Sequence, residues 1–400
     1  MEQNKITHKG APAVEPRPHG HRDYRMDNLK GLLIFAVVLG HMLELFKGND
    51  PNMKLLYLVI YSFHMPLFAF VTGVFARYQP DRIRKNMIYP YLVFQTLYLL
   101  FENQVMEKEA QMQYTTPYWL LWYLFAIIVW NLVLPLVQGK EFSGKKKLLI
   151  LLAAFAAAVL IGFDDKAGYY LSFSRIVEFF PYFLMGVYFR GWKEAFRQKR
   201  TALEPDGSAD QAGQAEQAGR FGRYGRLCRL GLFCRHNLFC RHGLAVKGAA
   251  VFALLFLLAG IIALLADNVE EIRTAWFYGS LSYERGDYTW RFRIFGMGAA
   301  FVWLAFFLLT MPARRLPFLS YIGANTMPVY LLHGFIIKFL SKIHLFRYIE
   351  NDVPAALLLS LLLVMLLSWK PLVSFLAPLF RWERREKKRR GQTRKTLVKV

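Results

Sequence analysis

Charged residues are scarce in this 400-residue chain: they make up 20% of it, whereas hydrophobic residues make up 55%. A soluble protein usually carries about 25% charged residues. Here the charges gather in short polar stretches between long apolar runs, which include LLIFAVVLG and VFALLFLLAGIIALLA. The segments that contain these runs are apolar on all sides and long enough to cross a hydrocarbon layer of about 30 Å. The composition therefore excludes a set of soluble domains and predicts membrane-spanning helices.

Cysteine is nearly absent: the chain has Cys228, Cys234 and Cys240, all in one basic stretch. We expect this stretch to lie in the reducing cytosol, where structural disulfides do not persist. Two of the cysteines belong to a tandem repeat, FCRHNL followed by FCRHGL. Its cysteines and histidines recur six residues apart, which is not a common zinc-ligand spacing. We therefore interpret the repeat as a duplicated basic insertion and expect no metal site.

About ten apolar segments are predicted to span the membrane, which makes the protein an all-α, polytopic integral membrane protein. The segments are 29–46, 55–75, 87–101, 118–137, 148–162, 173–189, 248–266, 293–311, 326–341 and 355–379. The first 26 residues are polar and hold no apolar core. We therefore expect no cleavable signal peptide and expect the first span to act as its own insertion signal.

The lysines and arginines predict which side each connection faces, because cytosolic connections are rich in both. With the N-terminus in the cytosol, 38 of the 51 basic residues lie in cytosolic segments and 12 in outer connections. We therefore expect both termini in the cytosol and the chain in a bacterial cytoplasmic membrane. The predicted parts are a tail at 1–28, a membrane domain at 29–380 with a flexible basic insertion at 192–246, and a tail at 381–400. The net charge of +23 fits this topology and contact with the lipid bilayer, so we expect no nucleic-acid partner.

Ionisable side chains inside a membrane span are costly, so the first span is the main candidate for a functional site. It holds Asp27, Lys30, His41 and Glu44 within MDNLKGLLIFAVVLGHMLELF. The eleven steps from Lys30 to His41 return to within about 20° of one helix face and rise about 16 Å. The two side chains could therefore hold the ends of one elongated ligand, while Glu44 orients the His41 ring. The alternative is that Lys30 reaches the lipid interface and His41 makes a hydrogen bond between helices.

The first span also carries a family resemblance. Within RMDNLKGLLIFAVVLGHM, ten residues separate a basic residue from a histidine, which resembles the first-helix signature of the acyltransferase 3 family of membrane O-acyltransferases. Similar motifs follow in the family's order: SFHMPLFAFVTGVFAR, DRIRKNMIYPYLVF, YWLLWYLFAII, FFPYFLMGVYFRG and LSYIGANTMPVYLLHG. The resemblance extends over about residues 22–380 and is greatest to the single-domain forms related to sugar O-acetylases.

This resemblance implies transfer of an acyl group, usually acetyl, from cytosolic acetyl-CoA or another acyl-CoA to a hydroxyl of an envelope carbohydrate. It points to His41 as the general base, a role suited to a neutral histidine near pH 7. The donor's phosphates would be held by basic side chains: Lys30, Arg82, Arg84 and Lys85. The Arg82–Lys85 spacing is similar to the family's two arginines three residues apart, but lysine stands second and lacks the bidentate fork. The alternative is that the basic residues at 82–85 only anchor the third span at the inner surface.

Three other predicted spans also hold polar side chains, His64, Glu178 and His333. His64 precedes Pro66 in a segment expected to be irregular. The predicted catalytic residues are then His41, Lys30, Glu44 and His64. For His333 a structural hydrogen bond is the favoured role, and Glu178 could equally pair with a basic neighbour or act in catalysis. The aromatic connection 267–292 could form a lid or sugar-facing surface, although an interfacial aromatic belt is the favoured interpretation.

Two rival functions would also suit many spans with buried polar side chains. One is a transporter or flippase of a polysaccharide precursor, and the other is a non-catalytic scaffold whose basic tails bind anionic lipids. The hydropathy shows no internal repeat of the kind found in transporters. A scaffold would not need Lys30 and His41 on one helix face. Acyl transfer is therefore the prediction that the sequence favours.

Overall fold

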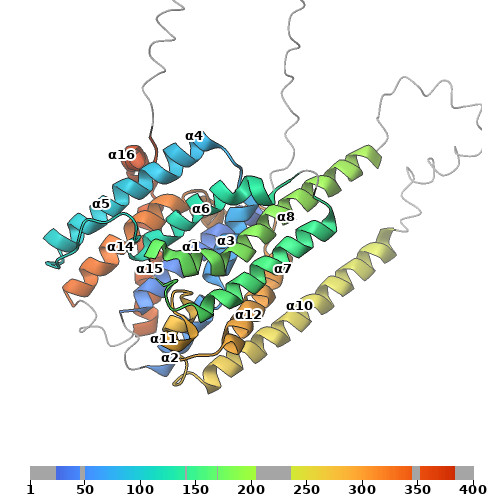
Figure 1. Ribbon diagram of the computed structural model, residues 1–400. Coiled ribbons are helices and arrows are strands. Elements are labelled where there is room, and N and C mark those ends of the chain that lie inside the picture. The colour runs from blue at the N-terminus through green and yellow to red at the C-terminus, as the bar shows by residue number, and fades with distance from the viewer. Residues whose placement is uncertain are drawn as a thin grey trace, which may run out of the picture.

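The computed structural model of the protein describes residues 24–45, 50–139, 142–168, 170–203, 236–344 and 352–382. Within these ranges the chain forms helices and turns and no β-strand (Figure 1). Six of the described helices are long and apolar enough to cross a membrane, and one bent helix pair brings the number to seven. The protein is therefore all-α, as the sequence predicts, and its helices are those of a multi-pass membrane protein.

The helices are described in chain order. Before the insertion they are α1 (Arg25–Leu43), α2 (Pro51–Tyr61), α3 (His64–Phe75), α4 (Pro80–Ile83), α5 (Tyr89–Gln104), α6 (Trp122–Val137), α7 (Gly144–Leu160) and α8 (Phe173–Leu203). After it they are α10 (His236–Asp267), α11 (Tyr283–Gly286), α12 (Trp290–Thr310), α13 (Pro317–Ala324), α14 (Thr326–Lys342), α15 (Asp352–Ser368) and α16 (Lys370–Phe380). Short turns join them: a π-helical turn, η1 (Arg84–Ile88), and 3-10 turns η2 (Trp119–Leu121), η3 (Ile161–Phe163), η4 (Tyr170–Ser172) and η6 (Thr274–Phe277).

Each predicted span coincides with a helix or a helix pair, but two spans are broken. The second consists of α2 and α3, which part at residues 62–63, just before Pro66. The last, 355–379, is not one helix, because α15 and α16 meet at a bend of 68°. The break lies at Trp369, whose backbone is extended (φ −62°, ψ 122°), and Pro371 stands in the first turn of α16, where proline is tolerated. The number of ten spans stays a prediction.

Helix α1 runs through the centre of the bundle (Figure 1). It packs against α13, α14, α15 and α3, and most of its side chains are buried on every face. The contact with α13 brings two backbones together at Gly31 and Gly323. A Cβ atom on Gly31 would overlap the carbonyl oxygen of Leu319, and one on Gly323 would overlap that of Asp27. Small residues allow this close approach, which fixes the position of the helix that carries Lys30 and His41.

Polar contacts hold the N-terminal end of α1. The Asn28 amide donates hydrogen bonds to the carbonyl oxygens of Pro312 and Arg314, at 2.9 and 3.0 Å. The Ser320 hydroxyl donates to the Asn28 side-chain oxygen at 2.5 Å. These bonds fix α1 against the segment between α12 and α13, so the register of Lys30 and His41 relative to the other helices is set.

The predicted insertion at 192–246 is helical at its two ends, because α8 continues to Leu203 and α10 begins at His236. Its centre, which includes Cys228 and Cys234, lies outside the described residues, as do both chain ends at 1–23 and 383–400. Helix α1 begins at Arg25, four residues before the predicted first span. The division into tails, membrane domain and insertion stays a prediction.

Candidate active site

The last turn of α1 brings His41 and Glu44 together. The Nδ1 atom of His41 lies 3.3 Å from the Oε1 atom of Glu44, and both side chains are largely buried. This is an electrostatic contact rather than a well-formed hydrogen bond. Two hydroxyls of α2 donate to the same carboxylate oxygen, Tyr57 at 3.0 Å and Tyr61 at 2.8 Å. Glu44 is thereby fixed beside the His41 ring, where the sequence places it.

Two other rings bound the space around His41. Trp119, from the turn η2, lies edge-on to it with ring centroids 4.7 Å apart, and His333, from α14, lies at 5.4 Å. His333 is fully buried, and its Nδ1 atom lies 2.9 Å from the carbonyl oxygen of Val329. The structural hydrogen bond predicted for His333 is therefore confirmed.

His64 is the first residue of α3, directly after the break that ends α2. Its Nδ1 atom lies 2.9 Å from the carbonyl oxygen of Ile60, and its ring meets the Tyr61 ring edge-on at 4.5 Å. The irregular segment predicted before Pro66 is therefore present. His64 is buried, and it lines the same cavity as His41 and Glu44. The break between α2 and α3 therefore brings His64 close to these two residues.

A cavity of about 420 Å³, the inner cavity, extends along α1 from Lys30 to His41. Its lining includes three strongly basic side chains: Lys30, Arg77 and Arg82. The Lys30 ammonium pairs with the Asp27 carboxylate at 2.9 Å. Much of the wall between the two ends is apolar and comes from α1, α3, α6 and α14. Lys30 and His41 thus face one elongated space, which is the arrangement expected from their eleven-residue separation.

The basic residues that follow Arg82 are placed differently. Arg84 and Lys85 are not among the described residues that line the inner cavity. The Arg84 guanidinium instead pairs with Asp81 at 3.0 Å, and both side chains are exposed. Two steps along a helix rotate by about 200°, so Arg84 lies on the side opposite Arg82. Lys85 belongs to the π-helical turn η1, which interrupts the 3.6-residue period directly after α4. Of the three basic residues that the sequence groups together, the structure therefore brings only Arg82 to the cavity.

A second cavity, the outer cavity, has a volume of about 220 Å³. His41, Glu44 and His64 line it. Its other lining side chains include Trp119, Trp122, Arg175, Phe179, Phe277 and Tyr278. His41 lines both cavities, so a molecule in either one can reach the same imidazole ring.

The aromatic connection between α10 and α12 forms part of the outer cavity, since Phe277 and Tyr278 belong to its wall. The Tyr278 hydroxyl lies 2.6 Å from the Tyr57 hydroxyl, which in turn donates to Glu44. The connection is therefore more than an interfacial belt, because one of its side chains joins the hydrogen bonds that position Glu44.

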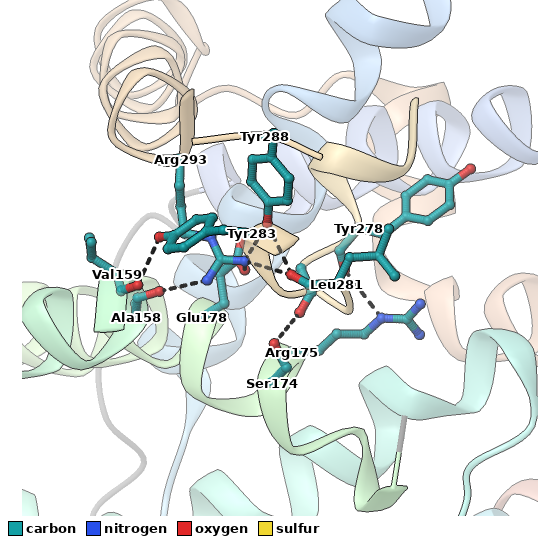
Figure 2. Close-up of polar contacts among 11 residues, drawn as sticks. Ala158, Val159, Ser174, Arg175, Glu178, Tyr278, Leu281, Tyr283, Tyr288 and Arg293 are labelled. Carbon is teal, nitrogen blue, oxygen red and sulfur yellow. Dashed lines mark hydrogen bonds and ion pairs between the residues drawn. The ribbon is translucent and has the colours of Figure 1, made fainter. Parts of the chain in front are cut away.

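A buried ion pair fixes this connection to the helices (Figure 2). The Arg293 guanidinium, from α12, lies 3.2 Å from the Glu178 carboxylate of α8. Arg293 also donates to the carbonyl oxygens of Ala158 and Leu281, at 3.1 and 3.2 Å, and to the Tyr288 hydroxyl at 2.6 Å. Of the two roles that the sequence left open for Glu178, pairing with a basic neighbour and catalysis, the structure shows the pairing.

Comparison with known proteins identifies the family. A sequence model of the acyltransferase 3 family, described as an acyltransferase domain, matches residues 23–373. The chain belongs to this family. The match covers nearly all of the predicted membrane domain, so the resemblance seen in the ordered motifs is confirmed and the protein is an acyltransferase.

This acyltransferase is also similar to the nodulation protein NolL of Sinorhizobium fredii. The two are 42% identical over 77 residues, which cover 17% of this chain and 21% of NolL. The chain thus aligns with about a fifth of the length of that relative. No solved structure matches the acyltransferase.

Several residues of the candidate site were not predicted from the sequence. Arg77 follows α3, and Arg175 lies in the first turn of α8, inside the predicted span 173–189. Trp119 and Tyr278 belong to connections whose contacts the sequence does not define. Among the described residues no group of three or more histidine, cysteine, aspartate or glutamate side chains could hold a metal ion.

Proposed function

We propose that this acyltransferase moves an acyl group, normally acetyl, from acetyl-CoA to a hydroxyl of an envelope carbohydrate. The inner cavity would take the donor, the outer cavity the acceptor hydroxyl, and His41 the proton. The observation that carries this proposal is that His41 lines both cavities. The proposed setting is a bacterial cytoplasmic membrane, with the Lys30 end of the inner cavity on the cytosolic side.

The length and charge of the inner cavity support a coenzyme A thioester. Between the phosphate and the sulfur, the pantetheine arm has about thirteen bonds, which reach about 15 Å when extended like a polypeptide backbone. Lys30 and His41 are separated by about 16 Å along the axis of α1. A donor with its phosphates near Lys30, Arg77 and Arg82 would thus bring its thioester to His41. The apolar middle of the cavity suits the arm's methyl and methylene groups.

The chemistry of His41 follows from its contacts. A neutral imidazole can accept the hydroxyl proton as the acceptor oxygen attacks the thioester carbonyl. The carbon–sulfur bond then breaks, and the coenzyme A thiolate takes the proton back from His41. Glu44 favours the charged imidazole that forms between these steps, because its carboxylate lies 3.3 Å from Nδ1. In this proposal Lys30 holds the donor, and His64 shapes the acceptor side.

The outer cavity suits a sugar. Much of its wall is aromatic, with Trp119, Trp122 and Tyr278 among the lining side chains. Flat aromatic faces pack against the apolar faces of sugar rings, and tyrosine and tryptophan also carry hydrogen-bond donors. The acceptor would enter from the side of the outer connections, which the distribution of basic residues places outside the cytosol.

The proposed transfer can be tested with membranes of the native host. Vesicles with and without the protein receive acetyl-CoA labelled in the acetyl group, and the carbohydrate is then isolated. We expect label in carbohydrate only where the protein is present, and its release by mild alkali, which cleaves esters. Label that remains in acetyl-CoA, or appears only as free acetate, would contradict the proposal. A parallel series with labelled succinyl-CoA determines the acyl group.

A further inference from the structure

Three stretches of the chain line the inner cavity along its length. They are 30–41 in α1, 65–75 in α3 and 120–131 in η2 and α6, and within each of them the lining side chains recur every three to four residues. This spacing places each set of side chains on one face of its helix. The three faces therefore form an elongated wall, and what they present at its two ends decides which part of a ligand lies where.

Contacts identify the two ends of this wall. At one end the Lys30 ammonium lies 5.0 Å from the centre of the Phe75 ring. At the other end the inner cavity meets the outer cavity. The described side chains that line both cavities, which we call the junction, are His41, Met65, Leu120 and Trp122.

In the proposed reaction the acyl group lies at the junction. A donor with its phosphates near Lys30 brings its sulfur to His41, and the acyl group is attached beyond the sulfur. The acceptor approaches from the outer cavity, which is therefore occupied when transfer takes place. The carbons of the acyl chain are then left among the other junction side chains. These are uncharged and largely apolar: Met65, Leu120 and Trp122.

Two of these side chains are held in place by neighbouring helices. The Leu120 carbonyl oxygen accepts a hydrogen bond from the Tyr330 hydroxyl of α14 at 2.6 Å. The Leu120 side chain packs so closely on α14 that a Cβ atom on Gly334 would overlap it. The ring centroids of Trp122 and Phe179, which belongs to α8, are 5.4 Å apart. These contacts fix two walls of the junction.

Met65 forms the third wall. It is the second residue of α3, directly after His64, and it is half-buried. Methionine is unbranched and fills irregular gaps between helices. A smaller residue at this position would leave space at the junction, because the surroundings of a shortened side chain relax only in part. The Met65 side chain therefore determines how far an acyl chain can extend from the thioester.

We infer that the junction admits an acetyl group and excludes longer acyl chains, and that Met65 sets this limit. One methylene group more or less in an apolar pocket changes specificity by about 10- to 200-fold. The inference rests on the proposed function, since it states which acyl-CoA donors the acyltransferase uses.

The test compares acetyl-CoA, propionyl-CoA and butyryl-CoA, each labelled in the acyl group, as donors in native-host membranes. The variants are Met65→Ala, Met65→Val, Met65→Leu and Met87→Ala. Met87 provides a matched control, because it lines the inner cavity and is not among the described residues that line the outer one. The measured quantity is the kcat/KM for propionyl-CoA divided by that for acetyl-CoA. This ratio does not depend on how much of a variant inserts into the membrane.

The wild-type ratio should be about 0.1 or less, and the corresponding ratio for butyryl-CoA should be smaller still. Met65→Ala should raise the propionyl ratio by about tenfold or more. Met65→Val removes fewer atoms and should raise it by less. Met65→Leu, which nearly conserves the side-chain volume, should keep the wild-type ratio, and so should Met87→Ala.

Three results would overturn the inference: a wild type that uses butyryl-CoA as well as acetyl-CoA, a wild-type ratio in both Met65→Ala and Met65→Val, or a rise in Met87→Ala as large as that in Met65→Ala. If the wild type transfers none of the three acyl groups to carbohydrate, the proposed function fails and the inference fails with it. That outcome is distinct, because no acylated carbohydrate then forms from which a ratio could be measured.

Discussion

The Nδ1 atom of His41 lies 3.3 Å from the carboxylate of Glu44, one helical turn further along α1. Tyr57 and Tyr61 hold that carboxylate from α2, and Tyr278 holds Tyr57 from the connection between α10 and α12. The position of one imidazole therefore depends on α1, on the neighbouring helix α2 and on a connection that is 221 residues further along the chain. Catalysis by His41 should be sensitive to each of them.

Glu44→Gln should lower the turnover number while it leaves the KM for acetyl-CoA near the wild-type value. The amide keeps the shape of the side chain but no longer stabilises a positive charge on the His41 ring. We expect a fall of about 10- to 100-fold, which is less than the loss of the general base itself. Tyr61→Phe, which removes one of two donors to the carboxylate, should have a smaller effect in the same direction. A wild-type turnover number in Glu44→Gln would contradict the orienting role of the carboxylate.

Arg82→Gln should raise the KM for acyl-CoA more than it lowers the turnover number, because Arg82 lines the inner cavity and Arg84 does not. The expected increase is about tenfold or more, as for a lost hydrogen bond to a charged group. Arg84→Gln should have a weaker effect, since Arg84 is exposed and paired with Asp81. Arg315→Gln, another exposed arginine on the same predicted side, is the control. Equal KM values for all three variants would mean that Arg82 only anchors the helix.

The Arg293–Glu178 pair should make a large contribution to stability. Both side chains are buried, so removing one partner leaves the other charge without compensation. We expect Glu178→Gln to lower the free energy of unfolding by about 3–5 kcal/mol, measured as a drop in melting temperature of the purified protein. The double variant Glu178→Leu with Arg293→Met should lose less than the sum of the single changes. A melting temperature of Glu178→Gln equal to that of wild type would show that the pair is not structural.

The orientation can be tested with the native cysteines. The charge distribution predicts that Cys228, Cys234 and Cys240 face the cytosol. A thiol reagent that does not cross membranes should therefore label them only after the cells are permeabilised. A single cysteine placed at the exposed position Glu284, in the connection that is predicted to face outward, should react in intact cells. Labelling of the native cysteines in intact cells would reverse the orientation and the assignment of the donor side.

The sequence predicts those features of the fold and site that depend on local periodicity. The helices stand where the apolar segments are, and the 100° rotation per residue correctly places Lys30 and His41 on one cavity. Prediction from periodicity fails where the helical period changes. The π-helical turn at 84–88 separates Arg82 from Lys85, and the bend before Pro371 divides the last span. Contacts across the bundle, such as those of Tyr278, depend on packing that no local pattern records.

The central claim is that His41 is the general base. His41→Gln keeps similar size and a hydrogen-bonding group but cannot accept a proton near neutral pH. The most direct measurement is the turnover number for acetyl transfer by purified His41→Gln protein in lipid nanodiscs, with His344→Gln as an exposed control. The account predicts a fall of about two to four orders of magnitude in His41→Gln, with protein level and acetyl-CoA affinity unchanged. A His41→Gln protein that inserts normally and transfers acetyl groups at close to the wild-type rate would contradict it.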